Sequence, residues 1–266
     1  MRFETIIIGA GAAGMMCAAH VQDTLVIDHA KAAGEKIRIS GGGRCNFTNI
    51  YAGAENFLSE NTHFAKSALA RYTQWDFIDL VQRYDIPYHE KTLGQLFCDT
   101  SAKDIIAMLR DLMKAAGAEL WLKTSVTSVR NENGIFTLDI LKGECAETLT
   151  CKNLVLATGG KSIPKMGATG FAYDIATQFG MRVTGTRPAL VPFTFSDGRF
   201  AEISGVSLPV RAQAGAGVFD EAMLFTHRGL SGPAILQISS YWAEGADITL
   251  NLTPDGTTMT SLRDQR

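Results

Sequence analysis

The sequence predicts an α/β protein in which a strand–turn–helix–strand unit and a β-meander are followed by a second, β-rich domain. The unit lies within residues 3–28, where a β-branched run, a glycine-rich turn, an Ala- and Met-rich stretch and a second apolar run follow one another. Alternating apolar runs between residues 118 and 160, two of them separated by the turn NENG, predict the meander. From residue 188 the pattern changes to short strands between Gly, Pro and Ser turns. We therefore expect one domain at 1–187 and a β-rich, barrel-like domain at 188–266.

Beyond the N-terminal unit the sequence predicts four helices. Residues 63–84 hold two amphipathic patterns, and a further helical stretch covers 170–179. The clearest helix spans 101–117, because Ser101 can cap it and Asp104 completes an S-x-x-D capping box.

Composition excludes several functional classes. The chain has 266 residues, of which 46% are hydrophobic and 20% charged, and its net charge of −2 gives no bulk basic field for a nucleic acid. The five cysteines form no CxxC pair, and no His or Cys spacing is typical of a metal site. We expect a cytoplasmic protein without a metal, a targeting segment or a membrane span.

Three glycines after the first strand predict a dinucleotide-binding turn of the Rossmann type. Gly9, Gly11 and Gly14 have the spacing G-x-G-x-x-G, and they stand between a strand and a helix, as this motif requires. Gly9 permits the tight turn, Gly11 lets the backbone approach a diphosphate, and Gly14 lets the helix pack on the strand. The free N–H groups of Ala12 and Ala13 would then face the diphosphate.

Asp28 completes this motif. It lies 19 residues after Gly9, at the end of the second strand, where a carboxylate accepts hydrogen bonds from ribose hydroxyls. An acid at this position disfavours the 2′-phosphate of NADP. The alternative is a glycine-rich turn with an incidental acid.

The order of the later strands favours FAD over NAD. The run LVLATGG, with Ala157, Thr158 and Gly159 at its end, follows the meander, as in two-dinucleotide flavoproteins of the glutathione-reductase type. The backbone near Val126, in the run KTSVTSV, could meet the adenine. A second G-x-G-x-x-G unit for a nicotinamide is absent from the sequence.

A second glycine-rich stretch, SGGGRCN, predicts another backbone surface that lies against a ligand. Gly41, Gly42 and Gly43 have no Cβ, so their backbone can lie close to a flat ring or a phosphate, and successive N–H groups can form an anion-binding nest. Arg44 could offset the negative charge of a diphosphate or of reduced flavin. Asn46 could satisfy loop backbone groups or the ring. The alternative is a mobile loop with a solvated arginine.

Cys45 and Lys36 each have two possible roles. Disulfide reductases of this fold need a second cysteine a few residues on, and positions 46–50 contain none, so we interpret Cys45 as a packed or ring-contacting thiol rather than a redox-active one. Lys36 either reaches a phosphate or is solvated.

Five motifs together resemble the BaiN/RdsA family of FAD-dependent NAD(P)/FAD oxidoreductases, the YhiN-type flavoproteins. They are GAGAAG, SGGGRCNFTN, GQLFCDTSAKDI, LVLATGG and LFTHRGLSGPAIL. The resemblance implies an FAD enzyme in which the SGGGRCN loop lies against the cofactor. It also implies one of three activities: dihydrouridine formation in large-subunit ribosomal RNA, reduction of a conjugated C=C bond in a small enone, or oxidation of an aminoacetone-like amine.

We predict C=C reduction by hydride transfer from flavin N5, with uridine in ribosomal RNA as the preferred substrate. The stretch HEKTLGQLFCD favours this choice, since it is most similar to the proteobacterial YhiN-type branch. His227, in LFTHRGLSGP, could donate a proton or hold a carbonyl, or it only ties a turn to the backbone. A non-catalytic FAD-binding module is a third alternative. The electron donor, NADH or NADPH among the candidates, and the oligomeric state stay open.

The resemblance also concerns the C-terminal end. Members of the family continue beyond 266 residues and return to the FAD domain with a segment like GE-x-x-D-x-x-G, which this sequence does not contain. We therefore expect the domain at 188–266 to be incomplete, and FAD binding by these 266 residues alone to be weakened.

Overall fold

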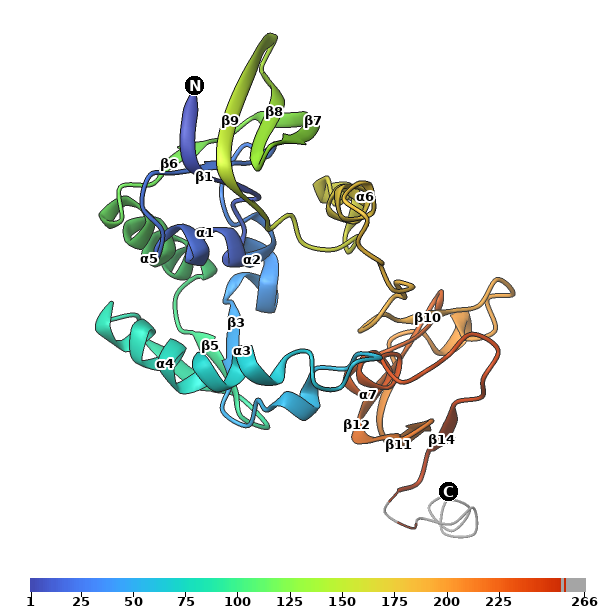
Figure 1. Ribbon diagram of the computed structural model, residues 1–266. Helices are drawn as coiled ribbons and strands as arrows, with labels where there is room; N and C mark the ends of the chain where they lie inside the picture. The colour runs from blue at the N-terminus through green and yellow to red at the C-terminus, as the bar shows by residue number, and fades with distance from the viewer. Residues whose placement is uncertain (255, 257–266) are drawn as a thin grey trace. The chain divides into compact units, whose positions relative to one another are not determined.

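A computed structural model of the chain describes residues 1–254 and 256, and it contains two compact units, Met1–Val183 and Thr184–Arg266 (Figure 1). The boundary expected at residue 187 stays a prediction, and residues 255 and 257–266 of the expected second domain lie outside the described residues. Within the described part of the chain, no helix is both long and apolar enough to cross a bilayer.

The first unit is built on a six-stranded sheet with the order β6-β2-β1-β9-β8-β7. Strands β1, β2 and β6 pair in parallel, and β7, β8 and β9 form the predicted antiparallel meander. The strand bounds are β1 Arg2–Ile8, β2 Thr24–Ile27, β6 Glu119–Trp121, β7 Thr124–Glu132, β8 Ile135–Lys142 and β9 Cys145–Leu156.

Strand β9 joins the two halves of this sheet. Its first half pairs antiparallel with β8, from Cys145 opposite Lys142, and its second half pairs in parallel with β1, up to Leu156 opposite Ile8. Because carboxyl ends of parallel strands meet at one edge of a sheet, β9 brings the ATGG turn next to the glycine turn that follows β1.

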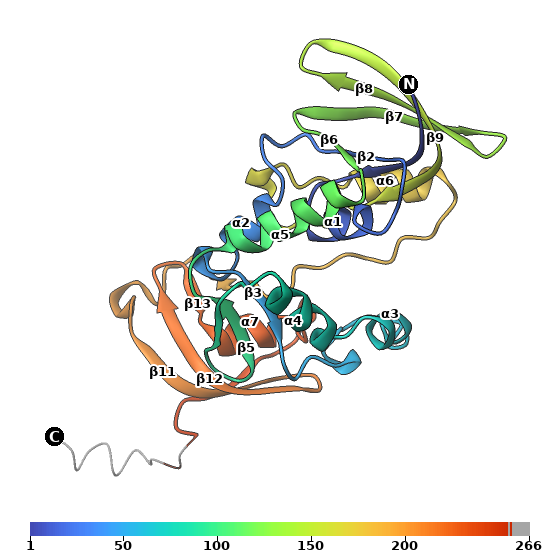
Figure 2. The same cartoon turned by 90° about the vertical axis from the view of Figure 1, so that its left-hand side faces the viewer.

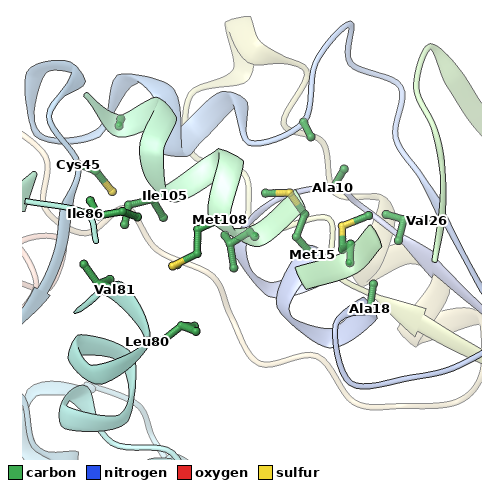
Figure 3. Packing of buried hydrophobic residues seen from close by; sticks show 14 of the residues in the cluster. Ala10, Met15, Ala18, Val26, Cys45, Leu80, Val81, Ile86, Ile105 and Met108 are labelled. Atoms are coloured by element: carbon green, nitrogen blue, oxygen red, sulfur yellow. The ribbon is translucent and has the colours of Figure 1, made fainter. Parts of the chain in front are cut away.

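Hydrophobic clusters cover both faces of the sheet. Along β1, Ile7 belongs to the cluster under helices α1, Ala12–Ala18, and α5, Ala102–Ala115 (Figures 1 and 2). Its neighbours Ile6 and Ile8 belong to the cluster on the other face, as the two-residue period of a strand requires. Figure 3 shows the first cluster, in which Met15, Val26, Ile105 and Met108 are buried together.

The predicted helices are confirmed. Helix α5 begins after Ser101, whose hydroxyl accepts the Lys103 N–H at 3.2 Å, while the Asp104 carboxylate accepts the Ser101 N–H at 3.3 Å. The remaining helices of this unit are α2 Glu35–Ile39, α3 Lys66–Arg71, α4 Gln74–Arg83 and α6 Phe171–Gln178.

A small antiparallel sheet with the order β3-β5-β4 also belongs to the first unit and was not predicted. Its strands are β3 Asn46–Asn49, β4 Tyr88–Glu90 and β5 Gln95–Cys98. Strands of three or four residues are too short for a recognisable period, and β3 is distant in sequence from the other two.

The second unit is an antiparallel sheet with the order β10-β13-β12-β11-β14, and helix α7, Pro233–Ile238, packs against it. This agrees with the predicted change to β-rich structure. The strand bounds are β10 Phe193–Thr194, β11 Ser207–Ala214, β12 Gly217–Thr226, β13 Gly229–Ser231 and β14 Thr249–Asn251.

Candidate cofactor site

Two glycines of the first motif are required by the packing of the chain itself. Gly9 has φ +112°, and a Cβ added there would lie 2.6 Å from the carbonyl carbon of Ala157. A Cβ on Gly14 would overlap the Gly9 carbonyl oxygen. These two glycines therefore hold β1, α1 and the ATGG turn together.

Gly11 is different, because nothing in the chain requires a glycine there. Its φ is −84°, which any residue adopts, and a Cβ built on it meets no atom within 4 Å. Gly11 stands at the N-cap of α1 without a side-chain cap, and the exposed Ala12 and Ala13 follow. The open space borders backbone N–H groups that lack an intrahelical acceptor, which fits a diphosphate.

The Asp28 carboxylate fixes the glycine turn from the end of β2. Its Oδ2 accepts the Ala10 N–H at 2.6 Å, and its Oδ1 accepts the Ala30 N–H at 2.8 Å. His29 Nδ1 lies 3.5 Å from Oδ1. Each carboxylate oxygen has a second lone pair, so a ribose hydroxyl could still bind there.

Lys36 forms two hydrogen bonds with the chain itself. Its Nζ donates to the Gly160 carbonyl oxygen at 3.3 Å and to Ser162 Oγ at 3.1 Å. It thereby ties α2 to the turn after β9, whose residue Gly159 has φ +73°. A contact between Lys36 and a phosphate stays a prediction.

The SGGGRCN loop forms a left-handed turn. Gly41, Gly42 and Gly43 have φ of +56°, +67° and +90°, and the following Cys45 has φ +50°. A Cβ on Gly41 would lie 2.7 Å from the Phe97 ring, so packing explains this glycine. Gly42 meets nothing within 4 Å, and Gly43 meets only the Arg38 carbonyl oxygen at 3.9 Å. Open space beside bare backbone again fits a flat ring or a phosphate.

Two polar residues of this loop, Arg44 and Asn46, are both exposed. The Arg44 carbonyl oxygen accepts the Cys98 N–H at 2.9 Å. The Asn46 amide nitrogen, in the orientation that satisfies its neighbours, donates to the Leu96 and Thr48 carbonyl oxygens at 3.2 and 3.1 Å. The Asn46 side chain thus bonds to backbone groups, which is one of the two roles expected from the sequence; the other was a hydrogen bond with the ring.

Cys45 is buried in the same cluster as Ala10 (Figure 3). Burial raises the pKa of its thiol, although a hydrogen bond with Ser40 partly opposes this rise. Burial, with a smaller contribution from Cys45, raises the pKa of Cys98 to about 12. Neutral thiols are poor nucleophiles, so the structure supports a packed role for Cys45.

The roles of two further predicted site residues, Val126 and His227, stay predictions. Val126 is half-buried on β7 and packs against the cluster that contains Ile8 and Ile27. His227 is exposed in the turn between β12 and β13, in the second unit, where the Thr226 hydroxyl accepts the Arg228 and Gly229 N–H groups. The turn is therefore held by Thr226 and not by the histidine.

Phe97 and Ser162 are site residues that the sequence analysis missed. Phe97 packs against Gly41, and Ser162 holds Lys36. Phe97 lies in the motif GQLFCDTSAKDI, which supported the family resemblance but assigned no role to this residue. No sequence pattern around Ser162 indicated a binding site. The residues that the structure describes include no group of three or more His, Cys, Asp and Glu side chains that could hold a metal ion.

A cavity of about 490 Å³ lies elsewhere in the first unit. Phe47, Phe57, Tyr72 and Phe77 are among the residues that line it. None of the predicted cofactor-binding residues lines this cavity.

One family model matches nearly the whole chain. The model for the HI0933-like protein Rossmann domain covers residues 3–262. The chain belongs to the HI0933-like family. The resemblance to flavoproteins of the BaiN/RdsA type, stated from five motifs, is confirmed.

Two bacterial relatives are identical to this chain at about half of the aligned positions. The Ribosomal RNA dihydrouridine synthase of Escherichia coli (strain K12) is 52% identical over 100% of this chain and 67% of its own length. The protein of the same name from Haemophilus influenzae (strain ATCC 51907 / DSM 11121 / KW20 / Rd) is 48% identical over 95% of this chain and 65% of its own length. The chain thus spans about two thirds of the length of these relatives.

More distant proteins are also similar. The 3-dehydro-bile acid delta(4,6)-reductase of Clostridium scindens (strain ATCC 35704 / DSM 5676 / VPI 13733 / 19) is 24% identical over 90% of this chain and 60% of its own length. Among solved structures, the open conformation of a flavocytochrome c3 fumarate reductase is 18% identical over 78% of this chain and 47% of that chain. Its TM-score is 0.47.

Proposed function

We propose that this protein is an FAD-dependent oxidoreductase that reduces a C=C bond, and that its substrate is uridine in large-subunit ribosomal RNA. Two relatives at 52% and 48% identity have the name Ribosomal RNA dihydrouridine synthase, which supports the substrate. The fit of the glycine segments to a dinucleotide supports the cofactor. The net charge of −2 means that RNA would be bound by local rather than overall positive charge.

The bare backbone at Gly11 is the observation that carries the cofactor assignment. Gly9 and Gly14 have internal reasons to be glycine, whereas Gly11 has an ordinary φ and an empty neighbourhood. A ligand that approaches the backbone is the reason that fits, and Ala12 and Ala13 would offer it their N–H groups. Asp28 would hold the ribose.

The remaining predicted contacts concern the flavin half of FAD. The backbone of Gly42 and Gly43 would lie against the ring or the diphosphate, beside Arg44. Bound FAD would supply hydride chemistry at its N5 atom. The chain would have to hold the pyrimidine, exclude water and supply one proton to the carbon next to the reduced one. NADH and NADPH are the proposed donors that reduce the flavin, and the bacterial cytoplasm, where ribosomes are made, is the proposed location.

Loss of the gene tests the substrate. We expect large-subunit ribosomal RNA from a deletion strain to lack dihydrouridine, as measured by mass spectrometry of digested RNA. A plasmid copy of the full gene should restore it. An unchanged dihydrouridine content in the deletion strain would refute the RNA substrate.

A small enone is the second candidate substrate, because one relative has the name of a bile-acid reductase. The two candidates differ in which compound reoxidises the reduced protein. We expect ribosomal RNA from the deletion strain to reoxidise it under anaerobic conditions, and a steroid enone not to do so. The reverse result would favour the small-molecule reductase.

A further inference from the structure

We propose that His89, held by Asp99, is the acid that protonates the substrate carbon. The inference rests on the proposed function, because C=C reduction requires a proton donor as well as hydride. His89 stands on β4 and Asp99 follows β5, and Nδ1 of the histidine lies 2.6 Å from Oδ1 of the aspartate. Both residues fall within HEKTLGQLFCD, the stretch that gave the closest match to the YhiN-type branch.

The small sheet places this pair on the same face as residues of the SGGGRCN loop. Phe97 of β5 is directly opposite Asn46 of β3 on one side and His89 of β4 on the other. Directly opposed residues of antiparallel strands point to the same face. The Phe97 ring is also the group against which Gly41 packs. The histidine is therefore two strands away from the loop proposed to lie against the flavin.

Contacts on both sides orient the imidazole. The ring stacks on Phe97, with centroids 6.3 Å apart and an interplanar angle of 19°, and Asp99 holds Nδ1. The Asp99 backbone is itself fixed, because its N–H donates to the Pro87 carbonyl oxygen at 2.9 Å. The other charged groups nearby are Lys91, whose Nζ lies 5.4 Å from the Phe97 ring centroid, and Glu90, which accepts the Gly94 N–H.

The second ring nitrogen is free to act. Among the described residues no group forms a hydrogen bond with His89 Nε2, and the side chains of His89 and Asp99 are 44% and 45% exposed. A carboxylate that binds Nδ1 fixes the ring with Nε2 facing outward, which is the arrangement of a histidine general acid. By comparison, no carboxylate contacts His227 in the described part of the second unit.

The proton balance of the step is simple. The C=C bond of uracil gains one hydride, with its electron pair, from reduced FAD and one proton from His89 Nε2. The pyrimidine is reduced and the flavin is oxidised, and the neutral imidazole recovers its proton from water. Asp99 is a positioning residue in this scheme and does not itself transfer the proton.

Single-turnover reduction of deletion-strain ribosomal RNA tests this assignment, with the FAD-loaded protein first reduced by dithionite under anaerobic conditions. We expect His89→Gln to slow dihydrouridine formation by about 10²- to 10⁴-fold, the usual contribution of a general acid, while FAD affinity stays within about twofold. The matched control is His63→Gln, because His63 is exposed and belongs to no proposed site. An H89Q protein as fast as the wild type, or a His227→Gln protein that alone loses the rate, would overturn the assignment.

A readout independent of turnover is the NMR signal of the His89 ring, assigned by its loss in H89Q. Millimolar uridine 5′-monophosphate should shift this signal in the FAD-loaded protein and leave the His63 signal in place. Asp99→Asn should change the protonation pattern of the two ring nitrogens, seen in their ¹⁵N shifts. Unmoved signals would contradict the assignment. A wild-type protein that converts no uridine would instead defeat the proposed function, so the two failures are distinguishable.

Discussion

At the scale of the residue, the glycines of the two glycine-rich segments meet different physical requirements. Gly9, Gly14 and Gly41 are glycine because the chain's own atoms lie where a Cβ would be. Gly11, Gly42 and Gly43 have no close protein neighbour at that point. Gly42 and Gly43 also have positive φ, which itself favours glycine, so Gly11 alone of these six has neither a packing nor a backbone requirement within the chain. Substitutions at Gly14 and Gly11 should therefore affect different measurements.

Gly14→Ala should destabilise the cofactor-free protein by about 3 kcal/mol or more, because the new methyl overlaps the Gly9 carbonyl oxygen and α1 has to move away from β1. Urea unfolding measures this loss. The matched control is Gly185→Ala, since a Cβ at position 185 meets nothing within 4 Å and its backbone is not left-handed. A G14A protein as stable as the control would contradict the packing described here.

The buried thiols predict a loss of stability at alkaline pH. The pKa of Cys98 rises from 9.0 to about 12 and that of Cys151 from 9.0 to about 11 on folding, in both cases mainly through burial. Between the unfolded and folded values the unfolded chain releases protons that the folded chain retains, so rising pH favours unfolding. The free energy of unfolding should fall by up to about 1.4 kcal/mol per pH unit for each thiol above pH 9, and not below it.

Cys98→Ala provides the check on this pH dependence. Urea unfolding between pH 8 and pH 11 should give a shallower decline for the C98A protein than for the wild type, because one of the titrating thiols is gone. Equal slopes would show that Cys98 does not contribute.

At the scale of the element, the strands and helices that bring the site together were predicted where they are long or marked by caps. The N-terminal unit, the meander and α5 were expected at nearly their observed positions, because period and turn residues agree there. The sheet of β3, β4 and β5 was not predicted, because its strands have three or four residues and β3 pairs with β5 across about fifty positions. The Gly41–Phe97 contact depends on this long-range pairing, and the Lys36–Ser162 contact depends on the turn after β9. Patterns within a single sequence could not predict either contact.

The N-cap of α5 gives the prediction at this scale. Replacing Ser101 with alanine removes the acceptor of the Lys103 N–H and should lower the free energy of unfolding by about 1 kcal/mol. Lys103→Ala, at an exposed position of the same helix, should change it by less than about 0.5 kcal/mol. Comparable losses in the two variants, measured by urea unfolding, would mean that the cap does not stabilise α5.

At the scale of the whole molecule, the α/β class, the β-rich second part and the family were predictable from the sequence. Membership of the HI0933-like family could be predicted from short motifs, because their glycines, caps and turn residues depend on local backbone geometry. The His89–Asp99 pair was not visible in this way, since two polar residues ten positions apart have no signature until two strands pair. The expectations of weakened FAD binding and of an incomplete second domain stay predictions.

The central claim is that the open backbone at Gly11 was shaped by a bound FAD, and equilibrium FAD titration of Gly11→Ala tests it most directly. We expect the variant to bind FAD at least about 10-fold more weakly than the wild type. The cofactor-free variant should unfold within about 1 kcal/mol of the wild type, because a Cβ there meets no protein atom. The Gly185→Ala control should keep wild-type affinity. A G11A protein that binds FAD as tightly as the wild type would contradict the claim.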